Sequence, residues 1–415
     1  MDHMLSSHQL LAKGHYTLKN VRLETGFEYE NEEVMGTLTD LFCIEIANGK
    51  INAIRAHDPN EDAIDMDGKL MLPAFKDMHV HIDKTLFGLP WQALSPKRKT
   101  VADMIAYEQQ IIPELLKTST LRAEQLIGLL QGYGTTYART HFNVDPTSGL
   151  QSFEHLLRAL EHKQESFEAE LVAFPQHGLY YTDSVPLMKE VAKYDQVDFI
   201  GGLDPYSIDG SVEKPLEFTV QLALDHNKGI DIHLHEAGPS GIQAIQYLID
   251  KAIENPQLQG KTFISHAFAL AHLDANEVEE IAEKLAFAQV GIASSVPFKG
   301  RPMPIPALRK CGVDVLIGND NVQDYWSTFG TGNMLQKANL IAQLYGYVTE
   351  FQLSRTLQFA TQQILPLDDE GKQQWPRIHD DAQLVFVNAT CSAEAVSRMS
   401  AVHAFMHNGN LFVTH

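Results

Sequence analysis

His79 and His81 are the residues whose type and spacing point most directly to chemistry. They stand one residue apart in the run Asp77-Met-His-Val-His-Ile-Asp-Lys84, directly after an apolar stretch typical of a buried strand. Side chains at alternate positions of a strand point to the same face, so the two imidazoles converge. Two converging nitrogens are what a first-row divalent metal needs from its ligands. The pair therefore predicts either a metal site or a hydrogen-bonded polar cluster.

The elements that would position this pair are short strand-like runs that alternate with stretches of helical period. The strand-like runs are 71–78, 135–140, 169–175, 197–202, 229–234, 261–265, 287–292 and 313–318. The helical stretches between them include 101–131, 152–163, 215–227, 242–253 and 276–285. Strands that alternate with helices predict parallel βα units, and eight such units close into a TIM barrel.

The two ends of the chain have a different pattern, with short strands and tight turns. Strand-like runs at 17–23, 41–46 and 50–55 precede the barrel, and runs at 382–388 and 401–413 follow it. Asn-Gly pairs at 48–49 and 408–409 are typical of hairpin turns. We expect residues 1–70 and 375–415 to form one small β-domain, attached to a barrel over residues 71–374. The predicted fold class is α/β, a TIM (β/α)8 barrel with a small β-sandwich domain formed by both chain ends.

Composition limits the partners and the compartment. The chain has 53 Asp and Glu against 32 Lys and Arg, a net charge of −21. Because phosphate binding depends on Lys and Arg, this excess argues against nucleic acid and anionic membranes as partners. The three cysteines are far apart and odd in number, which indicates a reducing compartment. No apolar run reaches the roughly 18–20 residues of a membrane span. We therefore expect a cytoplasmic protein whose partner is a small molecule.

Further histidines and an aspartate stand at the ends of the predicted strands, and in a TIM barrel those ends ring one mouth. Strand one ends in His79 and His81, strand five in His233, and strand eight in Asp320. These four residues could give three nitrogens and one oxygen to a single metal and leave one position open for water. The metal would lower the pKa of that water to about 7 and create hydroxide at neutral pH.

The same mouth contains residues that could move the protons of a hydrolysis. We predict that Asp320 takes the proton of the water, that His266 holds or polarises the hydroxide, and that Glu236 passes protons to the substrate. His235 and His141 also stand at strand ends, and each is expected to be a hydrogen-bonded structural residue. A non-catalytic metal-binding scaffold is the alternative of another class. The proton-transfer residues argue against it, because a scaffold has no need of them.

These residues resemble the amidohydrolase superfamily and, within it, the cytosine deaminase branch. The segments that carry the resemblance are 79–84, 139–141, 173–178, 231–236, 265–266 and 318–324, with Trp326. The resemblance implies the same four metal ligands, with Glu236 as the acid and base at a ring nitrogen and His266 beside the hydroxide. It also implies that Gln176 reads the edge of the ring and that Trp326 walls the pocket.

The resemblance also bears on the cofactor and the assembly. Binuclear members carry a carbamylated lysine after strand four, and the segment 201–206 contains no lysine, so one divalent metal ion is expected. Members use zinc or iron, and the ligand set does not choose between them. The resemblance favours a homo-oligomer.

Two departures from the family pattern leave the substrate open. Asn321 stands where cytosine deaminases usually have a second aspartate near the reacting end of the substrate, and His235 stands where that branch often has aspartate. The form His-Ile-Asp-Lys84 is also similar to N-isopropylammelide hydrolase, which removes an alkylamine from a triazine ring. The leading hypothesis is hydrolytic deamination of a heterocyclic amine. The alternatives are hydrolysis of a cyclic or N-substituted amide and removal of an alkylamine from a triazine-like ring. The loop 87–99 would add pocket contacts that the sequence does not define.

Overall fold

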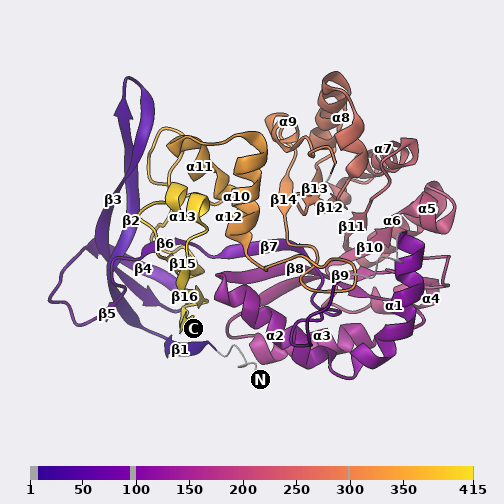
Figure 1. Ribbon diagram of the computed structural model, residues 1–415, viewed down its shortest axis with the longest axis horizontal. Helices are drawn as coiled ribbons and strands as arrows, with labels where there is room; N and C mark the ends of the chain where they lie inside the picture. The colour runs from indigo at the N-terminus through magenta and orange to yellow at the C-terminus, as the bar shows by residue number, and fades with distance from the viewer. Residues whose placement is uncertain (1–7, 94–99, 298–299, 415) are drawn as a thin grey trace.

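Two sheets organise the structure, and the ends of the chain share one of them (Figure 1). The computed structural model describes residues 8–93, 100–297 and 300–414. The first sheet has eight strands in the order of the sequence, and the second has nine strands from both chain ends. The predicted α/β fold class, a TIM barrel with a β-domain formed by both chain ends, is therefore confirmed, and the domain expected as a β-sandwich is built on one nine-stranded mixed sheet.

The barrel strands are all parallel. They are β7 (Phe75–Val80), β8 (Thr135–Asn143), β9 (Glu168–Phe174), β10 (Phe199–Leu203), β11 (Gly229–His233), β12 (Thr262–Ser265), β13 (Val290–Ser294) and β14 (Val315–Ile317). Each predicted run overlaps one of these strands. The prediction of a single strand at 71–78 was wrong, because this run also contains the end of β6 (Leu70–Pro73), which pairs in the other sheet. The chain passes from one sheet to the other at Ala74.

Helices connect the barrel strands in sequence. Those between β8 and β14 include α3 (Gln151–Lys163), α4 (Val185–Val191), α6 (Glu213–His226), α7 (Pro239–Glu254), α8 (Ala275–Phe287) and α9 (Ile305–Lys310), and α10 (Met334–Tyr345) follows β14. Amphipathic spacing explains their packing, as in α3, where Phe153, Leu156 and Ala159 are buried in the main core. The prediction of one helix at 101–131 was wrong. This range contains two helices, α1 (Val101–Leu116) and α2 (Ser119–Gly132), and the second starts after Thr118.

The barrel closes between its first and last strands, and the closure itself involves predicted site residues. Val80 and Asp320 form a parallel bridge. The backbone N–H of Asp320 donates to the carbonyl of His79 at 2.6 Å, and the N–H of His81 donates to the carbonyl of Asp320 at 3.0 Å. A Cβ at Gly318 would collide with the backbone of His79, so this close approach requires glycine. Barrel closure therefore fixes Asp320 beside the histidine pair.

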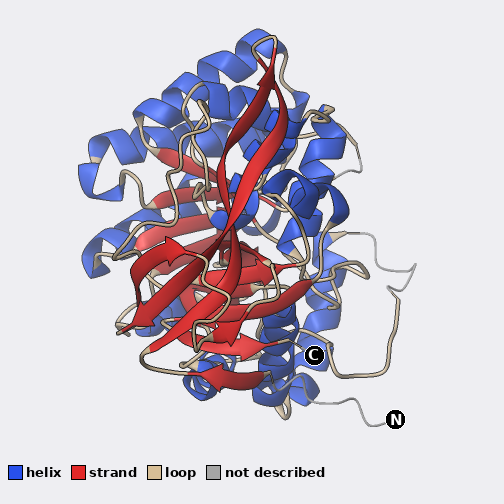
Figure 2. Cartoon of the chain, turned by 90° about the vertical axis from the view of Figure 1, so that its left-hand side faces the viewer, coloured by secondary structure: helices blue, strands red, loops and turns tan. Residues whose placement is uncertain are grey.

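The second sheet joins strands from both chain ends in the order β1-β17-β16-β15-β6-β2-β3-β4, with β5 paired to β2. Besides β6, its strands are β1 (Gln9–Ala12), β2 (Tyr16–Glu30), β3 (Glu33–Ala47), β4 (Lys50–Ala56), β5 (Ile64–Asp65), β15 (Leu384–Val387), β16 (Val402–His407) and β17 (Asn410–Val413). Figure 2 shows the β2–β3 hairpin as a long twisted ribbon. Both predicted Asn-Gly turns have positive φ at both residues, as type I′ turns require.

Smaller helices complete the described structure. They are α5 (Pro205–Asp209), α11 (Glu350–Thr356), α12 (Gln358–Thr361) and α13 (Ser392–Arg398), with short 3₁₀ helices at Pro256–Leu258 and Phe268–His272. Within the described ranges, no helix has the length and apolar character that crossing a membrane requires. The domain division after residues 70 and 374 stays a prediction.

Candidate metal and active site

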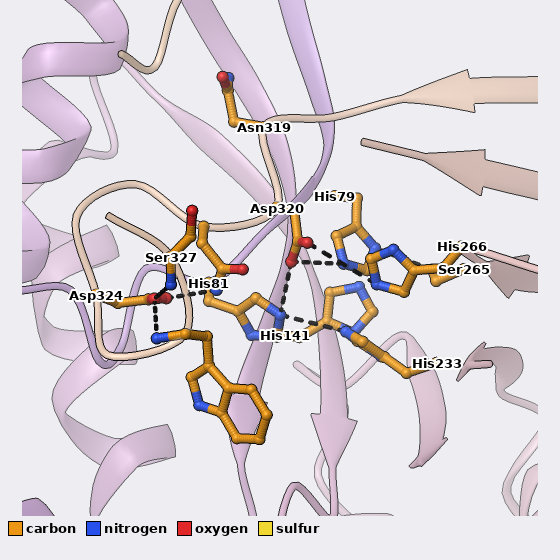
Figure 3. A network of polar contacts seen from close by, with 12 residues as sticks. His79, His81, His141, His233, Ser265, His266, Asn319, Asp320, Asp324 and Ser327 are labelled. Carbon is orange, nitrogen blue, oxygen red and sulfur yellow. Dashed lines mark hydrogen bonds and ion pairs between the residues drawn. The ribbon is translucent and has the colours of Figure 1, made fainter. Parts of the chain in front are cut away.

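Five imidazoles and one carboxylate gather at the carboxyl ends of the barrel strands (Figure 3). They come from β7 and the residue after it, β8, β11, the residue after β12 and the segment after β14, and belong to His79, His81, His141, His233, His266 and Asp320. The five histidines are at most 3% exposed, whereas the Asp320 side chain is 20% exposed. Strands far apart in the sequence therefore bring the predicted ligands into one buried cluster at the mouth.

The spacing of the donor atoms suits one small cation. Nε2 of His79 and Nε2 of His81 each lie 3.4 Å from Oδ1 of Asp320. Nε2 of His233 lies 3.2 Å from Nε2 of His81. A tetrahedral ion with bonds of about 2.0–2.1 Å holds its ligand atoms about 3.3 Å apart. Among the described residues, two groups have ligand atoms that all lie within 4.8 Å of one another: His79, His233, His266 and Asp320, and His79, His141 and Asp231. His81 adjoins the first group through Asp320.

Several ring nitrogens in this cluster are buried without a hydrogen-bond partner. Among the described residues they include Nε2 of His79, Nδ1 of His233 and both nitrogens of His141 and of His266. Buried polar atoms are nearly always satisfied in folded proteins, so each exception needs an explanation. A concentration of them around one carboxylate is typical of a site built to hold a ligand or an ion.

A buried relay sets the tautomer of His79. Oγ of Ser265 donates to Oδ1 of Asp231 at 2.6 Å, and the same Oγ lies 2.9 Å from Nδ1 of His79. Because the hydroxyl proton goes to Asp231, Oγ accepts the N–H of His79 Nδ1. The lone pair of His79 is then on Nε2, which faces Asp320. Nη1 of Arg139 lies 3.2 Å from the other oxygen of Asp231, Oδ2. Metal-binding histidines typically have such an outer partner.

Protonation in the cluster also suits a cation. Burial lowers the pKa of His81 to about 3, and burial together with neighbouring histidines lowers the pKa of His233 and His266 well below the ordinary value. Burial would raise the pKa of Asp320, but His266, His79 and His81 outweigh it and hold that pKa well below its usual range. Neutral imidazoles and an ionised carboxylate are the forms that bind metal.

His141 and His235, both expected to be structural, also lie at the mouth. The ring centroid of His141 lies 4.3 Å from that of His79 and 4.6 Å from that of His233. Nδ1 of His235 lies 2.9 Å from Oδ2 of Asp204, and its ring stacks on His266 at 4.4 Å. Burial alone would lower the pKa of His235, but Asp204 outweighs it and raises the pKa. His235 has the expected hydrogen bond, whereas His141 belongs to the buried cluster.

Glu236 follows β11 and is held at one oxygen only. Oε1 accepts the backbone N–H groups of Tyr206 and Ser207, at 2.9 and 2.8 Å, and the hydroxyl of Ser207 at 3.0 Å. Oε2 is buried and has no hydrogen-bond partner among the residues that the structure describes. One oxygen therefore fixes the side chain at the start of α5, while the other is available to exchange a proton.

Gln176 and Trp326, the predicted substrate contacts, meet around a lysine that the sequence reasoning did not assign. The ammonium group of Lys84 donates to Oε1 of Gln176 and lies 5.3 Å from the ring centroid of Trp326 and 5.9 Å from that of Phe174. Lys84 is only 4% exposed. Phe174 in turn stacks on His233 at 4.0 Å and 16°. The position of Lys84 three residues after His81 is the feature of the sequence that could have indicated that this lysine lies near the site.

Asn321 forms a hydrogen bond with Asp324, which in turn holds the loop that carries Trp326. Its amide donates to Oδ2 of Asp324 at 2.5 Å, while Oδ1 of Asp324 accepts the backbone N–H groups of Trp326 and Ser327 at 2.7 and 3.0 Å. Burial raises the pKa of Asp324 to about 6, although Lys84 and these hydrogen bonds oppose the shift. The predicted contacts from the loop 87–99 fall in part on residues 94–99, which lie outside the described residues.

Comparisons with known proteins give the geometry a context. The model of the amidohydrolase family matches residues 70–364. Protein YahJ of Escherichia coli (strain K12) is 49% identical over 402 residues, which cover 96% of this chain and 87% of YahJ.

Two solved structures share the fold over nearly their whole length. N-isopropylammelide isopropylaminohydrolase from Burkholderia multivorans ATCC 17616 superposes with a TM-score of 0.82 at 26% identity, covering 96% of this chain and 98% of that one. A 5-methylcytosine deaminase from Klebsiella pneumoniae superposes with a TM-score of 0.78 at 22% identity, covering 96% and 97% of the two chains.

Proposed function

This chain belongs to the amidohydrolase family, and from that membership we propose that it hydrolyses the bond between a nitrogen heterocycle and an exocyclic amine. Membership makes the chain a hydrolase of carbon–nitrogen bonds other than peptide bonds, as the sequence predicted. The observation that carries the finer proposal is the convergence of His79 Nε2 and His81 Nε2, each 3.4 Å from one oxygen of Asp320. Water attacks the ring carbon that bears the amine, a carbon–oxygen bond forms, and the amine leaves with a proton.

We assign one divalent metal ion, zinc or iron, to His79, His81, His233 and Asp320. The donor separations of 3.2–3.4 Å and the lowered pKa values of His81 and His233 support this assignment. The segment 201–206 at the end of β10 offers no lysine to bridge a second ion. The chemistry that such an ion supplies when bound is the activation of water near neutral pH.

The chain's own residues would move the protons. Asp320 is ionised, because its histidine neighbours hold its pKa well below the usual range, so it can take the proton of the attacking water. Nε2 of His266 lies 4.0 Å from Oδ2 of Asp320, and this proximity supports our assignment of His266 as the group that holds or polarises the hydroxide. The unpartnered Oε2 of Glu236 is the group we assign to protonate the ring nitrogen.

The substrate is assigned from the buried lysine and its neighbours. Lys84 is a cation beside Gln176, and the two can bind a ring edge that presents a carbonyl oxygen next to an N–H group. Trp326 supplies an aromatic wall for a planar ring. These contacts favour an oxo-substituted pyrimidine or triazine that carries an amine.

The leaving group has two forms in this proposal. Ammonia leaves in a deamination, and an alkylamine leaves from an N-alkylated ring. The likeness to N-isopropylammelide isopropylaminohydrolase and the presence of Asn321 in place of a second aspartate support the alkylamine form. Hydrolysis of a cyclic amide would instead open the ring without releasing an amine.

The test is amine release by metal-loaded protein from a panel that includes cytosine, 5-methylcytosine, a pterin and N-isopropylammelide. Ammonia is measured by coupled assay, alkylamine by chromatography and the ring by mass spectrometry. We expect one amine released for each ring hydroxylated. Asp320→Asn, after β14, should abolish release. Asp314→Asn should not, because Asp314 is an exposed aspartate that precedes β14. No amine from any ring would contradict the proposal, and ring opening without amine would favour the cyclic amide alternative.

A further inference from the structure

We propose that Glu108 is a positioning residue of the substrate pocket: it fixes the ammonium group of Lys84 and the indole of Trp326, and so fastens α1 over the barrel mouth. The role of the pocket rests on the proposed function. The contacts of Glu108 stand independently of it.

Helix α1 packs against the mouth of the barrel. Ile105 packs with Phe174 and Leu203, which end β9 and β10, and Val101 and Trp326 pack against the same small cluster. In Figure 1, α1 lies by the ends of these strands. Because Phe174 also stacks on His233, α1 is separated from the histidine cluster by one aromatic ring.

Glu108 is a buried polar residue of α1 that contacts the residues around Lys84 and Trp326. It is 1% exposed, and its carboxylate has three partners among the described residues. Oε1 lies 3.5 Å from Nζ of Lys84, while Oε2 accepts the indole N–H of Trp326 at 3.3 Å and lies 3.2 Å from Nε2 of His177. His177 is held from its other side by Asp145, at 3.2 Å. Two of the partners of Glu108 are therefore walls of the substrate pocket, and the third anchors it to the scaffold.

The contacts of Lys84 explain why the orientation of its ammonium group would affect substrate binding. An ammonium group has three N–H donors. Among the described residues, the oxygen acceptors given for Lys84 are Gln176 and Glu108, and we assign its third donor to a ring oxygen of the substrate. Burial would raise the pKa of Glu108, but Lys84 and His177 outweigh it and lower that pKa, so the carboxylate is ionised. Without it, the ammonium group and the indole would each lose the acceptor that fixes them.

A purely structural ion pair is the competing explanation, and it predicts a different pattern of coupling. A carboxylate that only neutralises buried cations would affect folding stability and nothing in the pocket. A carboxylate that aims Lys84 would affect binding of oxo-substituted rings only while Lys84 is present. The two explanations are therefore separated by a double-mutant cycle.

The first measurement is hydrogen exchange in α1 for Glu108→Gln. The matched control is Glu114→Gln, since Glu114 is an exposed residue of the same helix that pairs with Lys117. We expect the amides of 104–116 to exchange about tenfold faster in Glu108→Gln and unchanged in the control. Exchange like that of the control would overturn the proposal. If Glu108→Gln does not fold, Glu108→Asp takes its place in this measurement. This variant keeps the charge but withdraws the carboxylate by one methylene, so it should show the same acceleration.

The second measurement is the Kd of barbituric acid, a planar pyrimidine trione, for the metal-loaded protein by calorimetry. Glu108→Gln should weaken binding about 10- to 100-fold, the range expected for a charged hydrogen bond. In a Lys84→Met background the same change should alter Kd by less than about twofold. Equal effects in the two backgrounds would overturn the proposal. Failure of amine release from the substrate panel would remove the proposed function and leave the exchange result standing.

Discussion

Replacing Ser265 by alanine should weaken metal binding although no metal ligand changes. Oγ of Ser265 lies 2.6 Å from Asp231 Oδ1 and 2.9 Å from His79 Nδ1, both in the buried interior. The substitution leaves a carboxylate oxygen and an imidazole N–H without this partner, at a cost of about 1–3 kcal/mol each. It also frees His79 to turn or to change tautomer. Loss of such an outer partner lowers metal affinity by about 10- to 100-fold.

The assay is competition with a chelator of known affinity, with Ser354→Ala as the matched control. Ser354 is also buried, but its hydroxyl donates to the backbone carbonyl of Phe351, at 2.8 Å, far along the chain from the histidine cluster. Ser265→Ala should show the weaker affinity, and Ser354→Ala should bind as the parent does. Parent-like affinity in Ser265→Ala, in a protein that is destabilised as expected, would refute the claim that the relay orients His79.

Three further substitutions test separate parts of the account. Gly318→Ala should lower the free energy of unfolding by about 1–3 kcal/mol in urea denaturation, because a Cβ would collide with the backbone of His79; an unchanged value would argue against the close approach. Burial lowers the pKa of His177, but its two carboxylate partners outweigh burial and raise that pKa to about 9. The stability that His177 contributes is therefore complete below the ordinary pKa of histidine and is lost as the pH rises through 9. The gap in unfolding free energy between the parent and His177→Gln should therefore shrink by about 3 kcal/mol between about pH 6 and about pH 10, and a constant gap would contradict the assignment. Glu236→Gln should keep its melting temperature, because an amide oxygen can still accept the N–H groups at the start of α5, and should lower kcat by about 10²- to 10⁴-fold. Full activity would remove its assigned proton transfer.

Much of the fold followed from periodicity alone. The eight barrel strands and the hairpins at both chain ends were predictable because apolar runs, helical stretches and Asn-Gly turns alternate along the chain. The boundary at Ala74 was not predictable, because the apolar run that begins in β6 continues without a break through Ala74 to Phe75, the first residue of β7. The division of 101–131 into two helices was missed for a similar reason, since helical period continues through Lys117 and Thr118.

The histidine cluster was predictable because parallel strands bring their carboxyl ends to one mouth, so residues at strand ends need no further information to meet. The arrangement around Lys84 was not, because Glu108, His177 and Trp326 come from a helix and two loops whose mutual position has no sequence period. The roles of the site residues, the cytoplasmic location and the homo-oligomer stay predictions.

The most direct test of the central claim is a metal titration of chelated protein with amine release as the readout, using a ring that the metal-loaded protein turns over. We predict that chelation abolishes release, and that zinc or iron restores it in proportion to metal added until one equivalent per chain is bound. Release that survives chelation, or that rises until two equivalents are bound, would contradict a single metal held by His79, His81, His233 and Asp320.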